Sequence, residues 1–112
     1  MINVPIDFSK GNGFVPAIVQ DYQSGIVYML GYMDKEAFNK TKDTGFVYFW
    51  SRSKNRLWKK GEKSGNKLKV KNIFVDCDND TLLVNVELDG KNVCHTGNIT
   101  CFYTTLKGTY ET

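Results

Sequence analysis

The sequence predicts one mainly β domain of the α+β class, a mixed, barrel-like rolled sheet of about seven short strands with one or two short helices. Three observations support this expectation. The 112 residues fit a single domain, residues 1–112, at the usual size of roughly 100 to 200 residues. Apolar runs are short and separated by turn residues, and one segment alone has the signals of a helix. Strands therefore do not alternate with helices as they do in α/β folds.

The first elements along the chain are a hairpin and a helix. Residues 16–20 and 26–31 are rich in β-forming side chains and flank a Gln-Ser-Gly turn, which is typical of a β-hairpin. Asp34 is a suitable N-cap for a helix that continues through Lys42. Gly45 is placed to end this helix.

The remaining elements are expected to be strands joined by one longer loop. Residues 46–51 and 55–60 predict a second pair of strands, and the glycines and small polar residues of 61–66 predict a loop. Residues 81–88 give the strongest strand signal, because leucine and valine alternate with mostly polar residues at period two. Residues 99–104 are expected to form the last strand.

Composition excludes several classes of protein. The chain is 41% hydrophobic and 13% aromatic, which is enough to fill one core and excludes a disordered protein. Its apolar stretches fall far short of the roughly 20 residues that cross a bilayer. The first ten residues lack the basic and apolar segments of an export signal. We therefore expect a soluble, cytoplasmic protein with no membrane partner.

Charge is distributed unevenly along the chain. Between residues 51 and 71 there are nine basic residues and one acidic residue, a net +8, which leaves −5 for the rest of a chain whose net charge is +3. The basic residues are Arg52, Lys54, Arg56, Lys59, Lys60, Lys63, Lys67, Lys69 and Lys71. Such a concentrated basic segment indicates an anionic partner, either nucleic acid or a phosphorylated small molecule. The alternative is a solvated, lysine-rich hairpin.

Three cysteines, Cys77, Cys94 and Cys101, cannot all pair within one chain, and a cytoplasmic location favours free thiols or metal thiolates. Three thiolates select a soft ion such as Zn²⁺. A zinc with three protein ligands and an open fourth position is a catalytic arrangement in which the pKa of bound water falls to about 7. His95, next to Cys94, would act as a nearby base, or as a fourth ligand that makes the site structural. The remaining alternative is three small buried hydrophobic residues.

Three aspartates surround the first cysteine in the sequence DCDND. In an extended segment Asp76, Asp78 and Asp80 point to one side and Cys77 to the other. Three carboxylates form a hard oxygen site suited to Mg²⁺. The spacing also matches part of a calcium-binding EF-hand loop, but Thr81 stands where that loop needs glycine. A charged, solvated turn is the other alternative.

The basic segment carries the parts of a nucleotide site. Arg52, Arg56 and Lys60 alternate with tryptophans that could stack on bases, as in binders of single-stranded nucleic acid. The same parts would hold one nucleotide. The loop 61–66 offers backbone amides and the Ser64 hydroxyl to a phosphate. It lacks the GxxxxGK[ST] pattern of NTPase phosphate loops.

Nine segments, in order, resemble the phosphoribosyl-AMP cyclohydrolase family, enzymes of histidine biosynthesis, over nearly the whole chain. The segments are VPAIVQD (15–21), MLGYM (29–33), SRS (51–53), RLW (56–58), KGE (60–62), SGN (64–66), VDCDND (75–80), CHTG (94–97) and CFY (101–103). Their combination is far more specific than any single one.

The resemblance implies a hydrolase that opens the purine ring of N1-(5-phosphoribosyl)-AMP between N1 and C6 and yields the formimino carboxamide ribonucleotide. It also implies an intertwined homodimer that uses Zn²⁺ and Mg²⁺. Matched residue by residue, Cys77, Cys94 and Cys101 correspond to the zinc ligands, with Cys77 supplied by the opposite subunit. The magnesium ligands correspond to Asp76, Asp78 and Asp80.

Roles for the remaining site residues follow from this chemistry. We expect His95 to relay a proton, with Glu62 as the second candidate. The substrate has a phosphate at each end, and the residues expected to contact it are Arg52, Arg56, Trp58, Lys60, Ser64 and Gly65. The chain carries no pyrophosphohydrolase domain, so a form with this single activity is expected, with no nucleic-acid partner. The main alternative is a non-enzymatic nucleic-acid-binding domain with a structural zinc.

Overall fold

A computed structural model describes residues 5–108. The elements in chain order are the 3-10 helix η1 (Ser9–Gly11), β1 (Val15–Asp21), β2 (Val27–Met33), α1 (Lys35–Thr44), β3 (Tyr48–Ser51), β4 (Arg56–Lys59), β5 (Lys67–Val75) and β6 (Leu82–Asp89). The described part of the chain thus contains six strands and one α-helix, which confirms the mainly β α+β class. Within residues 5–108, no helix is long and apolar enough to cross a membrane.

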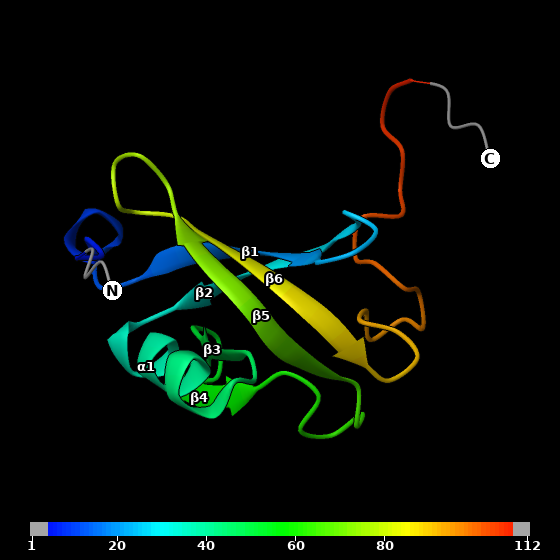
Figure 1. Ribbon diagram of the computed structural model, residues 1–112, viewed down its shortest axis with the longest axis horizontal. Helices are drawn as coiled ribbons and strands as arrows, with labels where there is room; N and C mark the ends of the chain where they lie inside the picture. Colours follow the sequence, from blue (N-terminus) through cyan, green and yellow to red (C-terminus); the bar gives the residue numbers. More distant parts are fainter. Residues whose placement is uncertain (1–4, 109–112) are drawn as a thin grey trace.

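Four strands form the main sheet in the order β2-β1-β6-β5 (Figure 1). β1 pairs antiparallel with β2 and parallel with β6, and β6 pairs antiparallel with β5, so the sheet is mixed as expected. The strands β3 and β4 form a separate two-stranded hairpin. The main sheet remains open, with β2 and β5 at its edges, and the expected closure into a barrel-like sheet is not seen.

The core lies on the inner face of the main sheet, where α1 and the β3-β4 hairpin cover it (Figure 1). Alternate residues of β1 and β6, such as Val19 and its register partner Val84, have no exposed surface. Phe49 of β3 packs on Gly31 of β2, where a Cβ would come within 2.6 Å of the ring. Each such large apolar side chain contributes about 1.5–3 kcal/mol when it is fully buried. The apolar side chains at every second position of the main sheet therefore form the surface on which the β3-β4 hairpin packs.

The helix and the first hairpin form where the sequence predicts them. The Asp34 carboxylate accepts a hydrogen bond from the Ala37 amide at 2.8 Å, and Gly45 ends the helix with a φ of +79°. The buried Thr41 hydroxyl accepts a hydrogen bond from the Tyr48 amide at 2.9 Å, which ties α1 to β3. These contacts fix the start of the β3-β4 hairpin against the helix.

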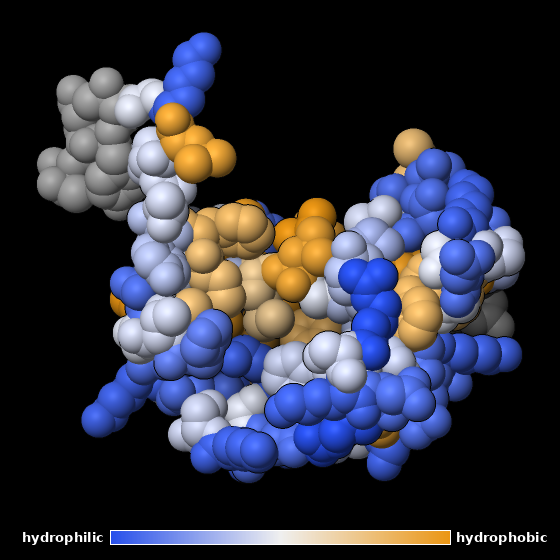
Figure 2. Space-filling model, turned by 180° about the vertical axis from the view of Figure 1, so that it is seen from behind, coloured by the Kyte–Doolittle hydropathy of each residue, from blue (hydrophilic) through white to orange (hydrophobic). Residues whose placement is uncertain are grey.

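An apolar row crosses the outward face of the main sheet. Leu30 of β2 is paired in register with Ile18 of β1, which is paired with Leu83 of β6, which is paired with Phe74 of β5. Leu30 is 43% exposed and Phe74 is 52% exposed. Apolar side chains also gather in a hollow on the rear face, beside the segment that leads to the C-terminus (Figure 2). One face of the sheet is thus left with an uncovered apolar surface.

Two segments differ from the expectation. Residues 99–104 do not form a strand. This segment contacts β2 through isolated hydrogen bonds, such as that from the Cys101 amide to the Tyr28 carbonyl at 2.8 Å. Ile99 is 54% exposed and so lacks the apolar partner that a sheet would provide. Conversely, β5 coincides with the lysine-rich end of the basic segment, where Leu68 is fully buried between exposed or half-buried lysines. The lysines concealed the alternation in the sequence.

Candidate active site

A cleft of about 450 Å³ lies between the β3-β4 hairpin, the loop after it and the segment 93–101. Its lining residues are Met29, Ser51, Lys54, Arg56, Trp58, Lys59, Lys60, Gly61, Glu62, Lys63, Ser64, Val93, His95 and Cys101. A second, open hollow of about 740 Å³ is lined by α1 and its N-cap alone and gathers no residues from other elements. The cleft therefore unites residues from both the basic segment and the cysteine-containing segment.

One wall of the cleft is built on β4. Trp58 faces Phe49 across the hairpin, with ring centroids 5.4 Å apart and an interplanar angle of 43°. Because Phe49 is only 1% exposed, this contact fixes the indole on the core. The half-buried indole thus offers the cleft a rigid aromatic surface.

Arg56 and Glu62 form an ion pair on the same wall. An Arg56 guanidinium N–H donates to Glu62 Oε2 at 2.9 Å, and the Lys59 backbone N–H donates to Oε1 at 2.9 Å. The hydrogen bond from Arg56 and that from the Lys59 amide lower the pKa of Glu62 below its ordinary value. Both carboxylate oxygens are engaged, so Glu62 orients Arg56 and is a weak proton acceptor.

The segment after β6 folds into a tight loop that carries Cys94 and His95. The Cys94 N–H donates to the Asn98 carbonyl at 3.1 Å, and the Gly97 N–H donates to the Cys94 carbonyl at 3.0 Å. Cys94 is 5% exposed, and its Sγ lies 3.0 Å from the Thr96 hydroxyl oxygen. The hydrogen bond from Thr96 is the main cause that lowers the pKa of the Cys94 thiol. The loop therefore favours the thiolate, the form that binds metals.

Cys101 joins Cys94 at this end of the fold. Its backbone N–H donates to the Tyr28 carbonyl at the start of β2. Desolvation raises the pKa of the Cys101 thiol, and its hydrogen bond with Cys94 adds to that effect. Cys101 also lines the cleft beside His95.

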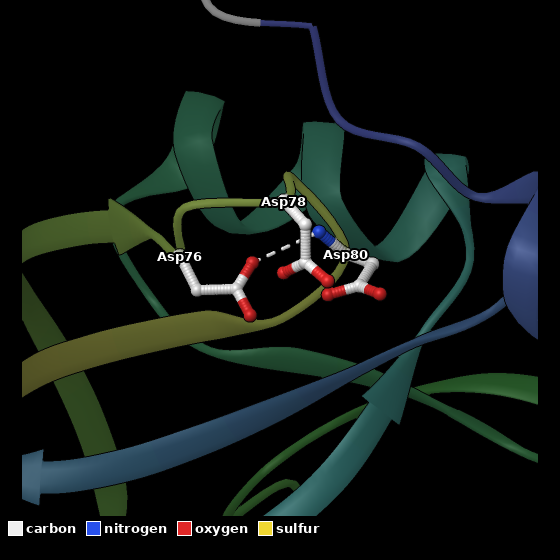
Figure 3. Close-up of side chains that lie close together, drawn as sticks. All are labelled: Asp76, Asp78 and Asp80. Carbon is white, nitrogen blue, oxygen red and sulfur yellow. Dashed lines mark hydrogen bonds between the residues drawn. The ribbon is translucent and has the colours of Figure 1, made fainter.

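The acidic cluster lies in the loop that joins β5 to β6. One ligand oxygen from each of Asp76, Asp78 and Asp80 lies within 4.8 Å of the others (Figure 3). Asp76 Oδ1 accepts hydrogen bonds from the backbone N–H groups of Asp80 at 3.0 Å and Thr81 at 3.2 Å, which close the loop. The neighbouring Asp76 and Asp80 carboxylates raise the pKa of Asp78, because they favour its protonated form, which can donate a hydrogen bond to them. Converging hard oxygen donors of this kind fit Mg²⁺.

The model of one protein family, described as phosphoribosyl-AMP cyclohydrolase, matches residues 29–103. The chain belongs to the phosphoribosyl-AMP cyclohydrolase family. The matched range contains the cleft, the acidic loop and all three cysteines, so the family is defined by the part of the chain that builds these features.

Curated relatives agree with this family. A phosphoribosyl-AMP cyclohydrolase from Clostridium botulinum (strain 657) is 56% identical over 101 residues, 90% of this chain and 91% of the relative. Another from Solibacter usitatus is 56% identical over 98 residues, 88% of this chain and 78% of the relative. A protein from Staphylococcus aureus named "Histidine biosynthesis bifunctional protein HisIE" is 55% identical over all 112 residues, which cover 52% of its length.

In this cyclohydrolase chain, Cys77 lies apart from the other two cysteines. It is exposed in the β5-β6 loop, at one end of β6, whereas Cys94 follows the other end. The eight residues of β6 span roughly 26 Å at a rise of about 3.3 Å each. Among the residues that the structure describes, the aspartates are the group of three candidate ligands that converges. One chain thus carries Cys94 and Cys101 in the segment after β6, and Cys77 in the loop before it.

Two of the expected substrate contacts lie beside the cleft and do not line it. The Arg52 guanidinium stacks on the Tyr32 ring, 4.1 Å from its centroid. Gly65 donates its N–H to the Gly61 carbonyl at 2.9 Å and shapes the loop next to Ser64. Both residues adjoin cleft residues in the sequence, and the expected Arg56, Trp58, Lys60 and Ser64 do line the cleft.

Sequence reasoning missed Lys10. Its ammonium lies 3.5 Å from an Asp80 carboxylate oxygen and 3.7 Å from one of Asp78, and it donates to the Asp78 carbonyl at 3.1 Å. Lys10 and Asp78 are 68 positions apart, so the spacing of residues in the sequence does not indicate this contact. A local cation therefore already balances part of the charge of the acidic cluster.

Proposed function

We propose that this protein is a phosphoribosyl-AMP cyclohydrolase of histidine biosynthesis, which hydrolyses the N1–C6 bond of the purine ring in N1-(5-phosphoribosyl)-AMP. Its family membership supports the activity. The observation that carries the proposal to this chain is the cleft, where a stacking indole, an oriented arginine and His95 surround a volume suited to one small molecule. The product is the formimino carboxamide ribonucleotide.

Binding of the substrate is assigned to the hairpin wall and its loop. Trp58 offers the purine a stacking surface, and Arg56, held by Glu62, presents its guanidinium to a phosphate. Ser64 provides a hydroxyl, while Arg52 and Gly65 flank this part of the cleft. The net charge of +8 over residues 51–71 attracts a substrate with a phosphate at each end.

Proton transfer is assigned to His95. Its exposed imidazole lines the cleft and follows Cys94 directly, so it lies beside the candidate metal ligands. Histidine is the side chain that most often transfers protons in enzyme active sites. Glu62, with both oxygens engaged and its pKa lowered, is the weaker candidate and is assigned to holding Arg56.

We propose a zinc site completed by two chains. Cys94 and Cys101 supply two thiolates, and the partner subunit's Cys77 supplies the third, because Cys77 of the same chain lies beyond the opposite end of β6, a strand that spans roughly 26 Å. Zinc, when bound, supplies a Lewis acid that makes hydroxide available at neutral pH. The Thr96 hydroxyl, 3.0 Å from Cys94 Sγ, supports the Cys94 thiolate.

Magnesium is assigned to Asp76, Asp78 and Asp80, whose hard oxygen donors converge. These residues share the β5-β6 loop with Cys77. A loop that delivers Cys77 to a partner's cleft therefore delivers the magnesium ligands with it. This places the acidic cluster of one subunit near the cleft of the other.

The homodimer is assigned to the outward face of the sheet. The row formed by Leu30, Ile18, Leu83 and Phe74 is a continuous apolar strip across four strands. Partial exposure of such a strip is unfavourable for a monomer and typical of an interface core.

Free thiols require a reducing compartment, so the proposed location is the cytoplasm.

The proposed activity is tested by supplying phosphoribosyl-AMP to the purified protein and following ring opening by ultraviolet absorbance, with and without a chelator. We expect turnover that is lost on chelation and restored by Zn²⁺ and Mg²⁺. Absence of turnover with both metals restored would refute the activity. Salt-dependent binding of a single-stranded oligonucleotide in that case would favour the nucleic-acid-binding alternative.

A further inference from the structure

The base of the Lys60 side chain is held rigidly by the core. Its backbone N–H donates to the carbonyl of Val47 at 3.0 Å, and Val47 has no exposed surface. The next residue, Gly61, is buried with a φ of +89°, and a Cβ there would collide with the carbonyl of Asn66. The side chain of Lys60 therefore starts from a fixed point beside the cleft.

The other end of the side chain is held by the cysteine-containing loop. The Lys60 ammonium donates to the carbonyl of Val93 at 2.6 Å. Val93 is 2% exposed, and its own N–H donates to the carbonyl of Ile99 at 3.2 Å, which closes the base of the loop 93–99. Lys60 thus connects the β4 end of the basic hairpin to the residue that precedes Cys94.

This contact also places a positive charge at the base of the loop 93–99. The hydrogen bond is partly buried, and a charged donor in such a position forms a stronger bond to a carbonyl than a neutral donor does. The loop is therefore held by a charge-assisted hydrogen bond.

Neighbouring lysines on the same cleft lack this arrangement. The Lys59 ammonium lies 4.5 Å from the centroid of the Phe46 ring, and Lys63 is exposed. A phosphate bound by Lys60 would compete with the contact to Val93 for the same ammonium. The Val93 carbonyl accepts its hydrogen bond from Lys60 and not from Lys63, so the Lys63 ammonium is available to an anion in the cleft.

We infer that Lys60 is a positioning residue that holds the loop carrying Cys94 and His95 against the cleft, and that it does not bind a substrate phosphate. The kinetic consequence of this role rests on the proposed function. The effect on the loop itself can be measured without turnover.

Amide hydrogen exchange on the purified, metal-loaded protein tests the effect on the loop. We expect Lys60→Met to accelerate exchange at the Cys94 and Gly97 amides by about tenfold or more, because a charge-assisted hydrogen bond is lost. The core amide of Val84 should keep its rate. Lys60→Arg should restore most of the protection, and Lys69→Met, which removes an exposed lysine of β5, is the matched charge control. Unchanged loop exchange, or an equal increase at Val84, would overturn the inference.

Steady-state kinetics on the same variants test the second half of the inference. Lys60→Met should lower kcat by about tenfold with KM changed by less than about twofold, because a group that aligns the site acts on the reacting complex. A rise in KM with kcat retained would identify Lys60 as a phosphate ligand and overturn it. If the unaltered protein has no turnover, the proposed function fails, and the exchange rates still decide the role of Lys60.

Discussion

Cys77 and Cys94 lie beyond opposite ends of strand β6, so this strand separates the two thiols within one chain. Cys77 belongs to the loop after β5, and Cys94 to the loop after β6. The strand between them spans roughly 26 Å over eight residues, whereas zinc–sulfur bonds are about 2.3 Å long. Under the proposed zinc site, the odd number of cysteines in the chain corresponds to an assembly in which the Cys77 loop and the Cys94 loop of one chain serve different copies of the site.

Leu83→Glu tests the interface. Leu83 lies within the outward apolar row, flanked in register by Ile18 and Phe74. A carboxylate there would be desolvated by an opposing sheet, so we expect the variant to sediment as a monomer with reduced turnover. Asn39→Glu on the exposed side of α1 makes the same charge change far from this row and should leave the dimer intact. A Leu83→Glu protein that sediments like the unaltered one would exclude this face.

Glu62→Gln separates two roles for this residue. If Glu62 orients Arg56, loss of its charge should raise KM by about tenfold and leave kcat within about twofold, because substrate binding alone is weakened. If Glu62 is the general base, kcat should fall by about 10²–10⁴-fold. Initial rates over a range of substrate concentrations distinguish the two, and we expect the first result.

His95→Ala tests the proton-transfer residue. We expect kcat to fall by about 10²–10⁴-fold while the zinc content, measured by elemental analysis, is retained. Full turnover with zinc retained would remove His95 from the chemistry. Loss of zinc together with turnover would instead make His95 a fourth ligand and the zinc site a structural one.

The first hairpin makes stability depend on pH through Asp21. The backbone N–H and the hydroxyl of Ser24 each donate to the Asp21 carboxylate at 2.7 Å, and these hydrogen bonds lower the pKa of Asp21 below its ordinary value. A carboxyl group with a lowered pKa in the folded state stabilises the fold above its unfolded pKa, and this stability is lost as pH falls through the folded pKa.

We therefore expect Asp21→Asn to lower Tm near neutral pH, and the difference in Tm to shrink as the pH falls below about 4. Thermal unfolding of both proteins across the acid range measures it. A difference in Tm that is constant over this range would show that the Asp21 charge makes no contribution.

Local signals in the sequence predicted the elements that local contacts determine. Asp34 and Gly45 bound the helix because capping depends on a few neighbouring backbone groups. The alternation in β6 predicted its buried face, where Leu82, Val84 and Val86 all lie inward. The parallel pairing of β1 with β6 joins segments more than 60 residues apart, so no local pattern in the sequence indicates it.

For the same reason, some residues of the candidate site can be predicted from the sequence, whereas the long-range contacts around them cannot. Residue chemistry points to the acidic cluster and the cysteines as candidate ligands, because ligand types and spacing are visible in the sequence, and the structure shows that the three aspartates lie close together. The contact of Lys10 with Asp80 and that of Lys60 with Val93 depend on how distant segments pack, so neither was predicted. Residues 99–104 were wrongly expected to form a strand, because strand propensity does not reveal whether a neighbour is available.

Mixing two inactive variants tests the two-chain site most directly. Cys77→Ala and Cys94→Ala should each abolish turnover, since each removes one zinc ligand from every site. After subunit exchange in an equal mixture, about half of the dimers are hybrids with one complete site each, so we predict about a quarter of the unaltered turnover. A mixture that stays inactive after exchange has been verified, or a Cys77→Ala protein that is fully active alone, would contradict the account.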